Sequence, residues 1–329
     1  LAVTNSRVDG LEARLNNFEA GGFSETTTAS FSVDAVIGAI DGDTTSEATT
    51  FDYQYNIGLS TSFTGEDSLD VAIDSGSSPT TNDNPMAFDT GSSLKVDGVT
   101  YSFPVGGVSM IVGDATDISA SFTGACSYSA FTDYMGDCGV GNSGGVGGNG
   151  VTATGSYSFD SGFSIAAGLS SETADAISSD GILTNEGLDT FGVEAAYTAD
   201  SWGLAVAYVS ADCAEAAETT SWGISGTYSF DSASLPSVSI GVESQETGGV
   251  DSNGYFVGLT WDEVGPGSVS VGAATAGNFT DAQTELMTYE ASYTYPVNDG
   301  LTITPGIFIE ETNGTDDLTG IIVKSSFAF

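Results

Sequence analysis

The sequence Leu318-Thr-Gly-Ile-Ile-Val-Lys-Ser-Ser-Phe-Ala-Phe329 carries its large apolar side chains mainly at alternate positions. The odd positions include Ile321, Val323, Phe327 and Phe329, whereas the even positions include Lys324, Ser326 and Ala328. Successive side chains of a β-strand point to opposite faces, so this pattern predicts a strand with one apolar and one polar face. An edge strand of any sheet could end in the same way, and the rest of the chain has to decide the architecture.

The same alternation recurs along most of the chain. In residues 51–59 the aromatic and aliphatic side chains share one face, and Asp52, Gln54 and Asn56 share the other. Further segments of this kind are 31–37, 69–73, 191–197, 255–261, 287–295 and 301–309. Strands of about nine residues or more are long enough to cross a bilayer at a tilt.

The connections between these segments alternate in length, which favours a closed barrel. The short ones are expected at 64–67, 103–106, 160–162, 200–201, 231–236, 263–267 and 297–300. The long ones are expected at 41–48, 75–92, 114–149, 171–186, 210–218, 245–252, 276–283 and 311–317. Short turns on one side and long loops on the other are typical of transmembrane barrels. The sequence therefore predicts an all-β, antiparallel transmembrane β-barrel of about sixteen strands over residues 23–329, with both ends on the short-turn side.

Residues 1–22 have a different pattern. Leu1, Thr4, Val8, Leu11, Leu15 and Phe18 fall on the a and d positions of a heptad repeat, and Gly21-Gly22 follows. This spacing predicts a short α-helical coiled coil that holds several copies of the chain together below the barrel. The alternative is a single amphipathic helix lying on the barrel mouth, because so short a helix needs tertiary or subunit contacts.

Composition excludes several classes of function. Lys and Arg number 4 and Asp and Glu number 45, which gives a formal net charge of −41. Nucleic acid would be repelled, so we expect no such partner. The chain has no histidine, which removes Ser-His-Asp and Cys-His catalysis and histidine-based zinc sites. We therefore do not expect an enzyme.

The longest predicted loop, 114–149, contains two of the three cysteines. Cys126 and Cys138 are close enough in sequence for an oxidising compartment to favour a disulfide between them. Three unrelated thiols, with Cys213 as the third, are the alternative. A bridge would stiffen the loop by restricting the unfolded chain. The glycine run at 139–148 lacks the lysine of a phosphate-binding loop.

Two motifs carry a resemblance to a known family. Residues 92–106, SSLKVDGVTYSFPVG, are similar to the strand-and-turn motif of the OprB-like carbohydrate-selective porins. Residues 5–14, NSRVDGLEAR, resemble the periplasmic coiled coil of the cyanobacterial branch. The resemblance implies homotrimers in a bacterial outer membrane. It also implies an upstream S-layer-homology domain that binds peptidoglycan-linked polymer. The sequence starts at Leu1 without a signal peptide, so we expect that an N-terminal part precedes it.

The resemblance also assigns roles to particular segments. It implies that the terminal Phe329 lies in the periplasmic aromatic girdle and is read by the insertion machinery. It implies that the loop at 114–149 folds inward as an eyelet, whereas a loop outside the pore is the alternative. The chain departs from the family in charge, since Lys95 and Lys324 are the only basic residues in the barrel region. A clamp of basic residues for sugars is therefore not expected.

The polar face of the predicted strands is strongly acidic. Candidate pore-lining residues are Asp34, Asp52, Asp70, Asp74, Glu194, Glu243, Glu290, Glu310 and Lys324. Rings of carboxylates favour cations, so the pattern predicts a preference for cations, and a solvated wall without selectivity is the alternative. The facing of Lys95 is ambiguous, because the alternation breaks between Val96 and Val99.

Acidic loops could in addition hold Ca²⁺ or Mg²⁺, which prefer oxygen ligands. The candidate ligands are Asp41, Asp43, Asp316 and Asp317, and none of them has the spacing of an EF-hand. Ordinary solvated loops are the alternative, and no other cofactor is expected.

These observations favour a passive diffusion channel for small hydrophilic solutes and inorganic ions. Two rival functions need no conduction: a barrel that tethers the outer membrane to the cell wall, and a surface adhesin that uses the long acidic loops. Conductance therefore distinguishes the first function from the other two.

Overall fold

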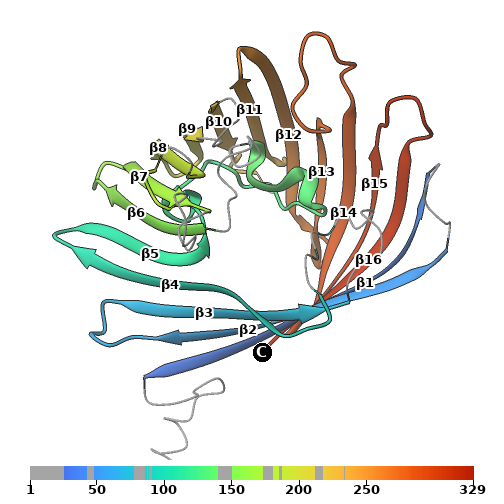
Figure 1. Cartoon of the computed structure of the whole chain (residues 1–329). Helices are drawn as coiled ribbons and strands as arrows, with labels where there is room; N and C mark the ends of the chain where they lie inside the picture. Colours follow the sequence, from blue (N-terminus) through green and yellow to red (C-terminus); the bar gives the residue numbers. More distant parts are fainter. Residues whose placement is uncertain are drawn as a thin grey trace, which may run out of the picture.

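The protein is a closed barrel of antiparallel strands (Figure 1). The computed structural model describes residues 26–42, 48–77, 86, 88, 91–139, 150–172, 181–184, 187–211, 218–232 and 234–329. Within these ranges the strands are β1 (Thr27–Asp41), β2 (Thr50–Thr61), β3 (Ser68–Gly76), β4 (Lys95–Val105), β5 (Val108–Thr116), β6 (Gly150–Ser158), β7 (Phe163–Ser171), β8 (Asp189–Thr198), β9 (Trp202–Ala211), β10 (Thr219–Tyr228), β11 (Ser237–Thr247), β12 (Val250–Val264), β13 (Gly267–Thr275), β14 (Met287–Asn298), β15 (Leu301–Glu310) and β16 (Leu318–Ala328). Two 3₁₀ helices, η1 (Ile118–Ser121) and η2 (Asp133–Gly139), lie between β5 and β6.

The prediction of a barrel with sixteen strands is confirmed. The coiled coil expected at 1–22, with Val8, Leu11, Leu15 and Phe18, lies outside the described residues.

The barrel closes where β1 pairs with β16. Ser32 is opposite Ala328, and the pairing continues to Asp41 opposite Thr319. Beyond it, Phe31 and Phe329 exchange two backbone hydrogen bonds of 3.0 Å, and their rings stack with centroids 6.3 Å apart. The C-terminus accordingly lies beside β1 (Figure 1). Closure leaves no strand edge unpaired, which removes the usual route to edge-to-edge aggregation.

The connections follow the expected alternation of long and short except on either side of β11, where the segment between Tyr228 and Ser237 is as long as some of the long loops. Most long connections exceed six residues, and the longest joins β5 to β6. The loop expected at 245–252 is instead a two-residue turn, because β11 extends to Thr247 and β12 starts at Val250. Gly248 and Gly249 have φ values of 61° and 81°, the geometry that a tight hairpin requires at both central residues. The polar residues around them therefore belong to strand ends rather than to a loop.

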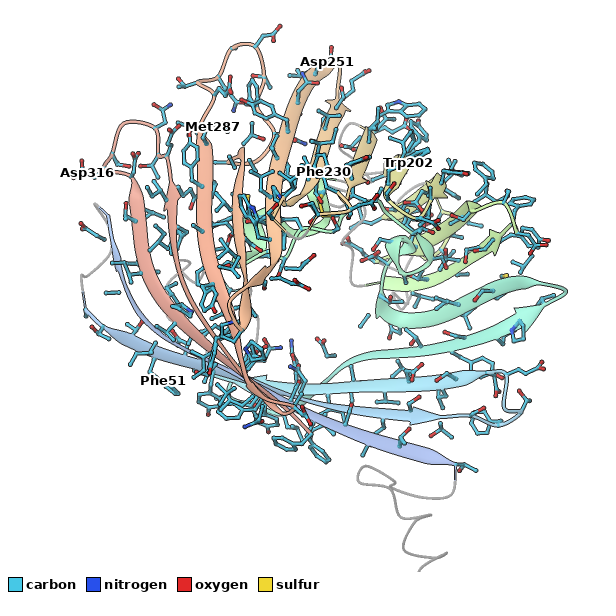
Figure 2. The ribbon with its side chains drawn as sticks, turned by 180° about the vertical axis from the view of Figure 1, so that it is seen from behind. Phe51, Trp202, Phe230, Asp251, Met287 and Asp316 are labelled. Atoms are coloured by element: carbon cyan, nitrogen blue, oxygen red, sulfur yellow. A yellow bond between two sulfur atoms is a disulfide. The ribbon has the colours of Figure 1, made fainter. Side chains whose placement is uncertain are left out.

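The outer face of the barrel is apolar. Ile37, Phe51, Val193, Ile240 and Ile321 are exposed on it, as are many similar side chains. Figure 2 shows side chains standing out around the ribbon, with Asp251 and Asp316 at the tips of the long-loop end. Aromatic pairs gather beside the short turns, namely Tyr101 with Phe103, Tyr157 with Phe159, Tyr197 with Trp202, and Tyr228 with Phe230. Within the described ranges, no helix is long and apolar enough to span a bilayer.

Asp67 organises the short turn between β2 and β3. Its Oδ1 accepts hydrogen bonds from the backbone N–H groups of Phe63 (2.9 Å) and Thr64 (2.8 Å), and from the hydroxyls of Ser62 and Thr64. Its Oδ2 accepts the Tyr101 hydroxyl of β4 at 2.7 Å. The bond from Tyr101, followed by that from the Thr64 N–H, holds the pKa of Asp67 well below its usual range.

We expect Asp67→Asn to lower the thermal stability of the barrel at neutral pH, and the difference from the wild type to narrow in acid. The folded pKa lies below the unfolded value of about 3.9. The contribution of the ionised carboxylate is therefore complete above the unfolded pKa and is lost as the pH falls through the folded one. Thermal unfolding of both proteins in detergent, from neutral pH to strongly acidic pH, measures this. A difference that stayed constant over that range would contradict the assignment.

Candidate functional site

The described part of the connection between β5 and β6 lies inside the ring of strands (Figure 1). Residues 117–139, here called the inner loop, cross the inner faces of the strands from β7 to β15. This placement agrees with the expectation of an inward-folded loop. The inner loop is bound to the wall by three kinds of contact: hydroxyl groups, carboxylates and apolar side chains that fit against glycines.

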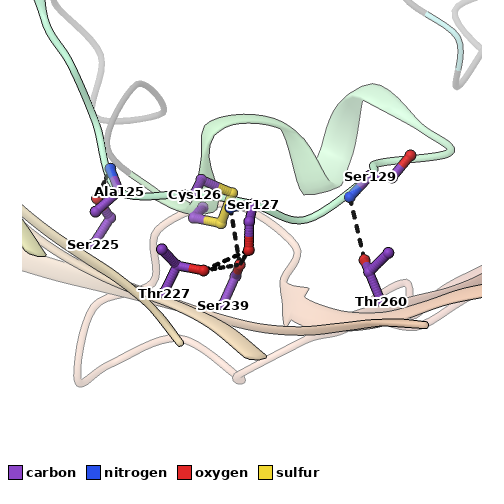
Figure 3. Close-up of a disulfide and its surroundings, with 9 residues drawn as sticks. Ala125, Cys126, Ser127, Ser129, Ser225, Thr227, Ser239 and Thr260 are labelled. Carbon is purple, nitrogen blue, oxygen red and sulfur yellow. Dashed lines mark hydrogen bonds between the residues drawn. A yellow bond between two sulfur atoms is a disulfide. The ribbon is translucent and has the colours of Figure 1, made fainter. Parts of the chain in front are cut away.

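The first kind is a row of serine and threonine hydroxyls that accept hydrogen bonds from the inner-loop backbone (Figure 3). The Ala125 N–H donates to Ser225 on β10 at 2.9 Å, and the Ser127 N–H donates to Ser239 on β11 at 3.1 Å. The Ser129 N–H reaches Thr260 on β12 at 3.4 Å. Every second residue from Ala125 to Ser129 thus pairs with the next strand, which gives these backbone N–H groups partners in the wall.

Two glutamates of the wall provide the second kind of contact. Glu194 on β8 accepts the N–H groups of Thr123 (2.5 Å) and Gly124 (3.1 Å). Glu290 on β14 accepts the Phe131 N–H (2.7 Å), both the N–H (2.8 Å) and the hydroxyl (2.5 Å) of Thr132, and the Tyr128 hydroxyl (2.9 Å). Both carboxylates are buried, with 4% and 3% of their surfaces exposed. The sequence-based expectation that they line the open pore is therefore wrong, because the inner loop covers them.

The third kind of contact places apolar side chains of the inner loop where the wall has glycine. An added Cβ at Gly192 would lie 2.2 Å from Ile118, and one at Gly258 would lie 2.3 Å from Tyr128. At Gly306 it would lie 2.5 Å from the Phe131 ring. Real Cβ atoms do not approach other atoms so closely, so these glycines are hollows that only a residue without a side chain can form. We call them the glycine hollows.

A disulfide joins Cys126 to Cys138 across the inner loop, with Cα atoms 5.5 Å apart (Figure 3). Cys138 is fully buried and packs with Met135 of η2, Phe256 of β12 and Ala274 of β13. The bridge therefore closes residues 126–138, which run along β11 to β14, into a covalent loop. Cys213 lies outside the described residues.

The inner faces of β1 to β3 carry three of the predicted aspartates. Asp34, Asp52 and Asp70 are partly exposed. They accept hydrogen bonds from hydroxyls, namely those of Ser326, Ser77 and Ser68 respectively. Opposite residues of paired strands share a face, and Asp34 has the parity of Val36, which packs against Phe131 of the inner loop. We call Asp34, Asp52 and Asp70 the aspartate strip.

The other predicted residues have different surroundings. Asp74 is on the same inner face but is buried, with 3% of its surface exposed, so it is not open to the lumen as expected. Glu243 and Glu310 line a pocket of about 320 Å³ together with Asp133 and Tyr134 of η2. Lys324 is opposite Val36 and Thr304, on the inner face, and is half-buried.

The ambiguity at Lys95 is resolved by a break in the pairing of β3 with β4. Ala72 is opposite Gly98 and Ile73 is opposite Val96, so Asp97 is an extra residue in β4. Beyond the break Lys95 is opposite Asp74, which places it on the inner face. Its ammonium lies 3.9 Å from the Asp97 carboxylate, with about half of each side chain exposed. A pair so exposed contributes little to stability.

Three of the four candidate ligands for divalent cations lie at the end of β1 and between β15 and β16. Asp41, Asp316 and Asp317 are exposed, and Asp317 accepts the Thr312 N–H at 3.1 Å within its own loop. Asp43 lies outside the described residues. The described part of the chain has no group of three or more acidic or cysteine side chains arranged to hold a metal ion.

Solved structures with the same arrangement cover nearly the whole chain. Pseudomonas putida OprB, in a high-pH structure, superposes with a TM-score of 0.73 at 14% identity over 92% of this chain and 94% of that one. The fold is that of the porins. An anion-selective porin from Comamonas acidovorans has a TM-score of 0.65 at 13% identity, over 92% and 99% of the two chains. A mutant of the Rh. blastica porin has a TM-score of 0.61 at 14% identity, over 92% and 100%. No protein-family model and no curated protein matches the sequence.

Within this porin fold, the wall residues that hold the inner loop were missed by sequence reasoning. Ser225, Ser239 and Thr260 are small hydroxyl residues at inward positions, and the glycine hollows occupy inward positions as well. A signal was present, since inward residues on β6 to β13 are mostly Gly, Ala, Ser or Thr, whereas β1 to β3 carry Asp and Asn there. Small inward side chains leave room for a second layer against the wall.

Proposed function

We propose that this protein is an outer-membrane porin that passes small hydrophilic solutes and inorganic ions by passive diffusion and prefers cations. The observation that carries the proposal is the inner loop, which is bound across one side of the barrel interior by hydrogen bonds and glycine hollows. A loop held in this way narrows a pore without closing it, and the apolar outer face suits a hydrocarbon environment.

The preference for cations rests on the aspartate strip. Its three carboxylates are partly exposed on the inner faces of β1 to β3, and their hydrogen-bond partners are hydroxyls rather than basic groups. Among the described residues, Lys95 and Lys324 are the basic side chains on the inner face. Carboxylates along a pore wall lower the energy of cations and raise that of anions.

Planar-bilayer recording tests both parts of the proposal. The purified protein is added to a bilayer that separates two KCl solutions differing tenfold in concentration. We expect stepwise conductance and a reversal potential of the sign that cation flow produces, below the limit of about 59 mV for a tenfold ratio. Absence of conductance would favour the tether or the adhesin, and a potential of the opposite sign would reject the preference for cations.

The same proposal includes localisation and assembly. We place the barrel in the outer membrane of a Gram-negative-type bacterium, a cyanobacterium by the resemblance of residues 5–14 and 92–106, as an OprB-like homotrimer. Val8, Leu11, Leu15 and Phe18 would join the three copies, and a preceding domain would bind cell-wall polymer. The scarcity of basic residues supports neutral sugars and cations, rather than anions, as solutes.

A further inference from the structure

Glu290 binds four groups of the inner loop, whereas Glu194 binds two. Its two oxygens accept four hydrogen bonds, all from residues 128–132, with donor–acceptor distances between 2.5 and 2.9 Å. Two donors are backbone N–H groups and two are hydroxyls. Only 3% of the Glu290 surface is exposed. Hydrogen bonds to a carboxylate are stronger than those between neutral groups, so this one side chain holds residues 128–132 of the inner loop firmly against β14.

We infer that Glu290 is the positioning residue that sets the position of the inner loop, and with it the largest solute that passes. The inference rests on the proposed channel function. Glu290 is buried, so its effect on solutes is exerted through residues 128–132, which it binds.

The arrangement requires an acceptor with no hydrogen of its own. Each carboxylate oxygen faces donors: the Tyr128 hydroxyl and the Phe131 N–H meet Oε1, and both groups of Thr132 meet Oε2. An amide in place of the carboxylate would turn an N–H₂ group towards one pair of donors. Burial and the nearby charge of Glu290 raise the pKa of Tyr128, so its hydroxyl stays protonated and donates at neutral pH.

The place of these contacts within the inner loop explains why their loss should change the position of the loop. Phe131 donates one of the four bonds, and its ring lies in an apolar cluster with Val36, Phe308 and Ile322 where β1 meets β16. Glu194 holds residues 123–124, and the hydroxyl row holds 125–129. Loss of the Glu290 bonds therefore frees the part of the inner loop that reaches furthest across the interior, and leaves the beginning attached.

The test compares Glu290→Gln with Glu310→Gln. Bilayer recording measures the conductance of each variant, and liposome swelling with neutral sugars and polyethylene glycols of graded size measures its size limit. Glu310 is an inner-face glutamate on the next strand, and the same charge is removed there without any of the four bonds. We expect Glu290→Gln to admit solutes above the wild-type size limit, and the entry rate of the first excluded solute to rise by about tenfold or more, since one hydrogen bond to a charged group is sufficient for such a factor. Glu310→Gln should leave the size limit unchanged.

A second pair of variants keeps the inference testable if Glu290→Gln does not fold. Thr132→Val and Tyr128→Phe remove donors on the inner-loop side and leave the wall intact, so each should raise the size limit by a smaller amount. Combined with Glu290→Gln, Thr132→Val should add little, because both remove the same contact. An unchanged size limit in folded Glu290→Gln, or in the Thr132→Val and Tyr128→Phe double variant, would overturn the inference. Additive effects of Thr132→Val and Glu290→Gln on the size limit would overturn it as well. Absence of conductance in the wild type would instead reject the channel function.

Discussion

Gly306→Val is expected to produce a wider and noisier channel in a barrel that still folds. The Phe131 ring lies 2.5 Å from the position that a Cβ at residue 306 would occupy, so the valine and the ring cannot share that space. Valine suits a strand, so we expect the Phe131 ring, rather than β15, to move. Full burial of a phenylalanine side chain contributes about 1.5–3 kcal/mol, and its loss would shift the bound-to-released ratio of the loop by at least about tenfold.

The measurement is single-channel conductance together with the size limit for neutral sugars. The matched control is Gly226→Val on β10, where an added Cβ meets nothing closer than Ile240 at 3.5 Å, an ordinary contact. The preceding residue, Ser225, faces inward and binds the inner loop, so a side chain at position 226 lies on the outer face of the barrel. Heat stability of the barrel in detergent should be similar in both variants. Wild-type conductance and size limit in folded Gly306→Val would show that the hollow does not hold the inner loop in place.

The second large effect is expected from the aspartate strip. Asp34→Asn, Asp52→Asn and Asp70→Asn together should bring the reversal potential of the channel close to zero in a KCl gradient and leave its conductance in concentrated salt nearly unchanged. The substitution removes three carboxylates and keeps their size and their capacity to accept hydrogen bonds from Ser326, Ser77 and Ser68. Mobile ions screen surface charge over about 10 Å at 0.1 M, so the loss should be greatest in dilute salt.

Three aspartates at the long-loop end provide the control for charge number. Asp251→Asn, Asp316→Asn and Asp317→Asn remove the same charge from exposed positions at the long-loop end, where Figure 2 labels Asp251 and Asp316. If selectivity arises along the inner face of β1 to β3, this variant should keep most of the wild-type reversal potential. Equal losses in the two variants would assign the selectivity to the overall charge of the protein rather than to the strip.

The sequence predicts the barrel well because its evidence is local. Alternation within a strand depends on neighbours two residues apart, and the closing strand at Leu318–Ala328 shows it as clearly as the central ones. One connection was predicted wrongly: Gly248-Gly249 with its polar flanks resembles a loop in composition, and only the pairing of Thr247 with Val250 shows a tight hairpin. The single extra residue Asp97 likewise obscured the facing of Lys95.

The candidate site could be predicted only in part, because its contacts join distant segments. Parity places Glu194 and Glu290 on the polar face, but their partners come from the inner loop, and Tyr128 precedes Glu290 by 162 residues. Periodicity describes which face a side chain occupies and does not describe what covers that face. The position of the cysteines and the small inward residues indicate a second layer, yet neither specifies that Glu290 receives four bonds while Glu310 borders a pocket.

The seam between β1 and β16 has a consequence for the order in which the molecule forms. The other fifteen strand pairs join neighbours in sequence. Ser32 and Ala328, in contrast, must meet across nearly the entire chain. Contacts between such distant residues carry the highest entropic cost and form slowly. We therefore expect an open, curved sheet with two free edges as the last species before closure. The residues of the seam, Phe31 and Phe329 among them, should be the latest to gain protection from hydrogen exchange during assembly.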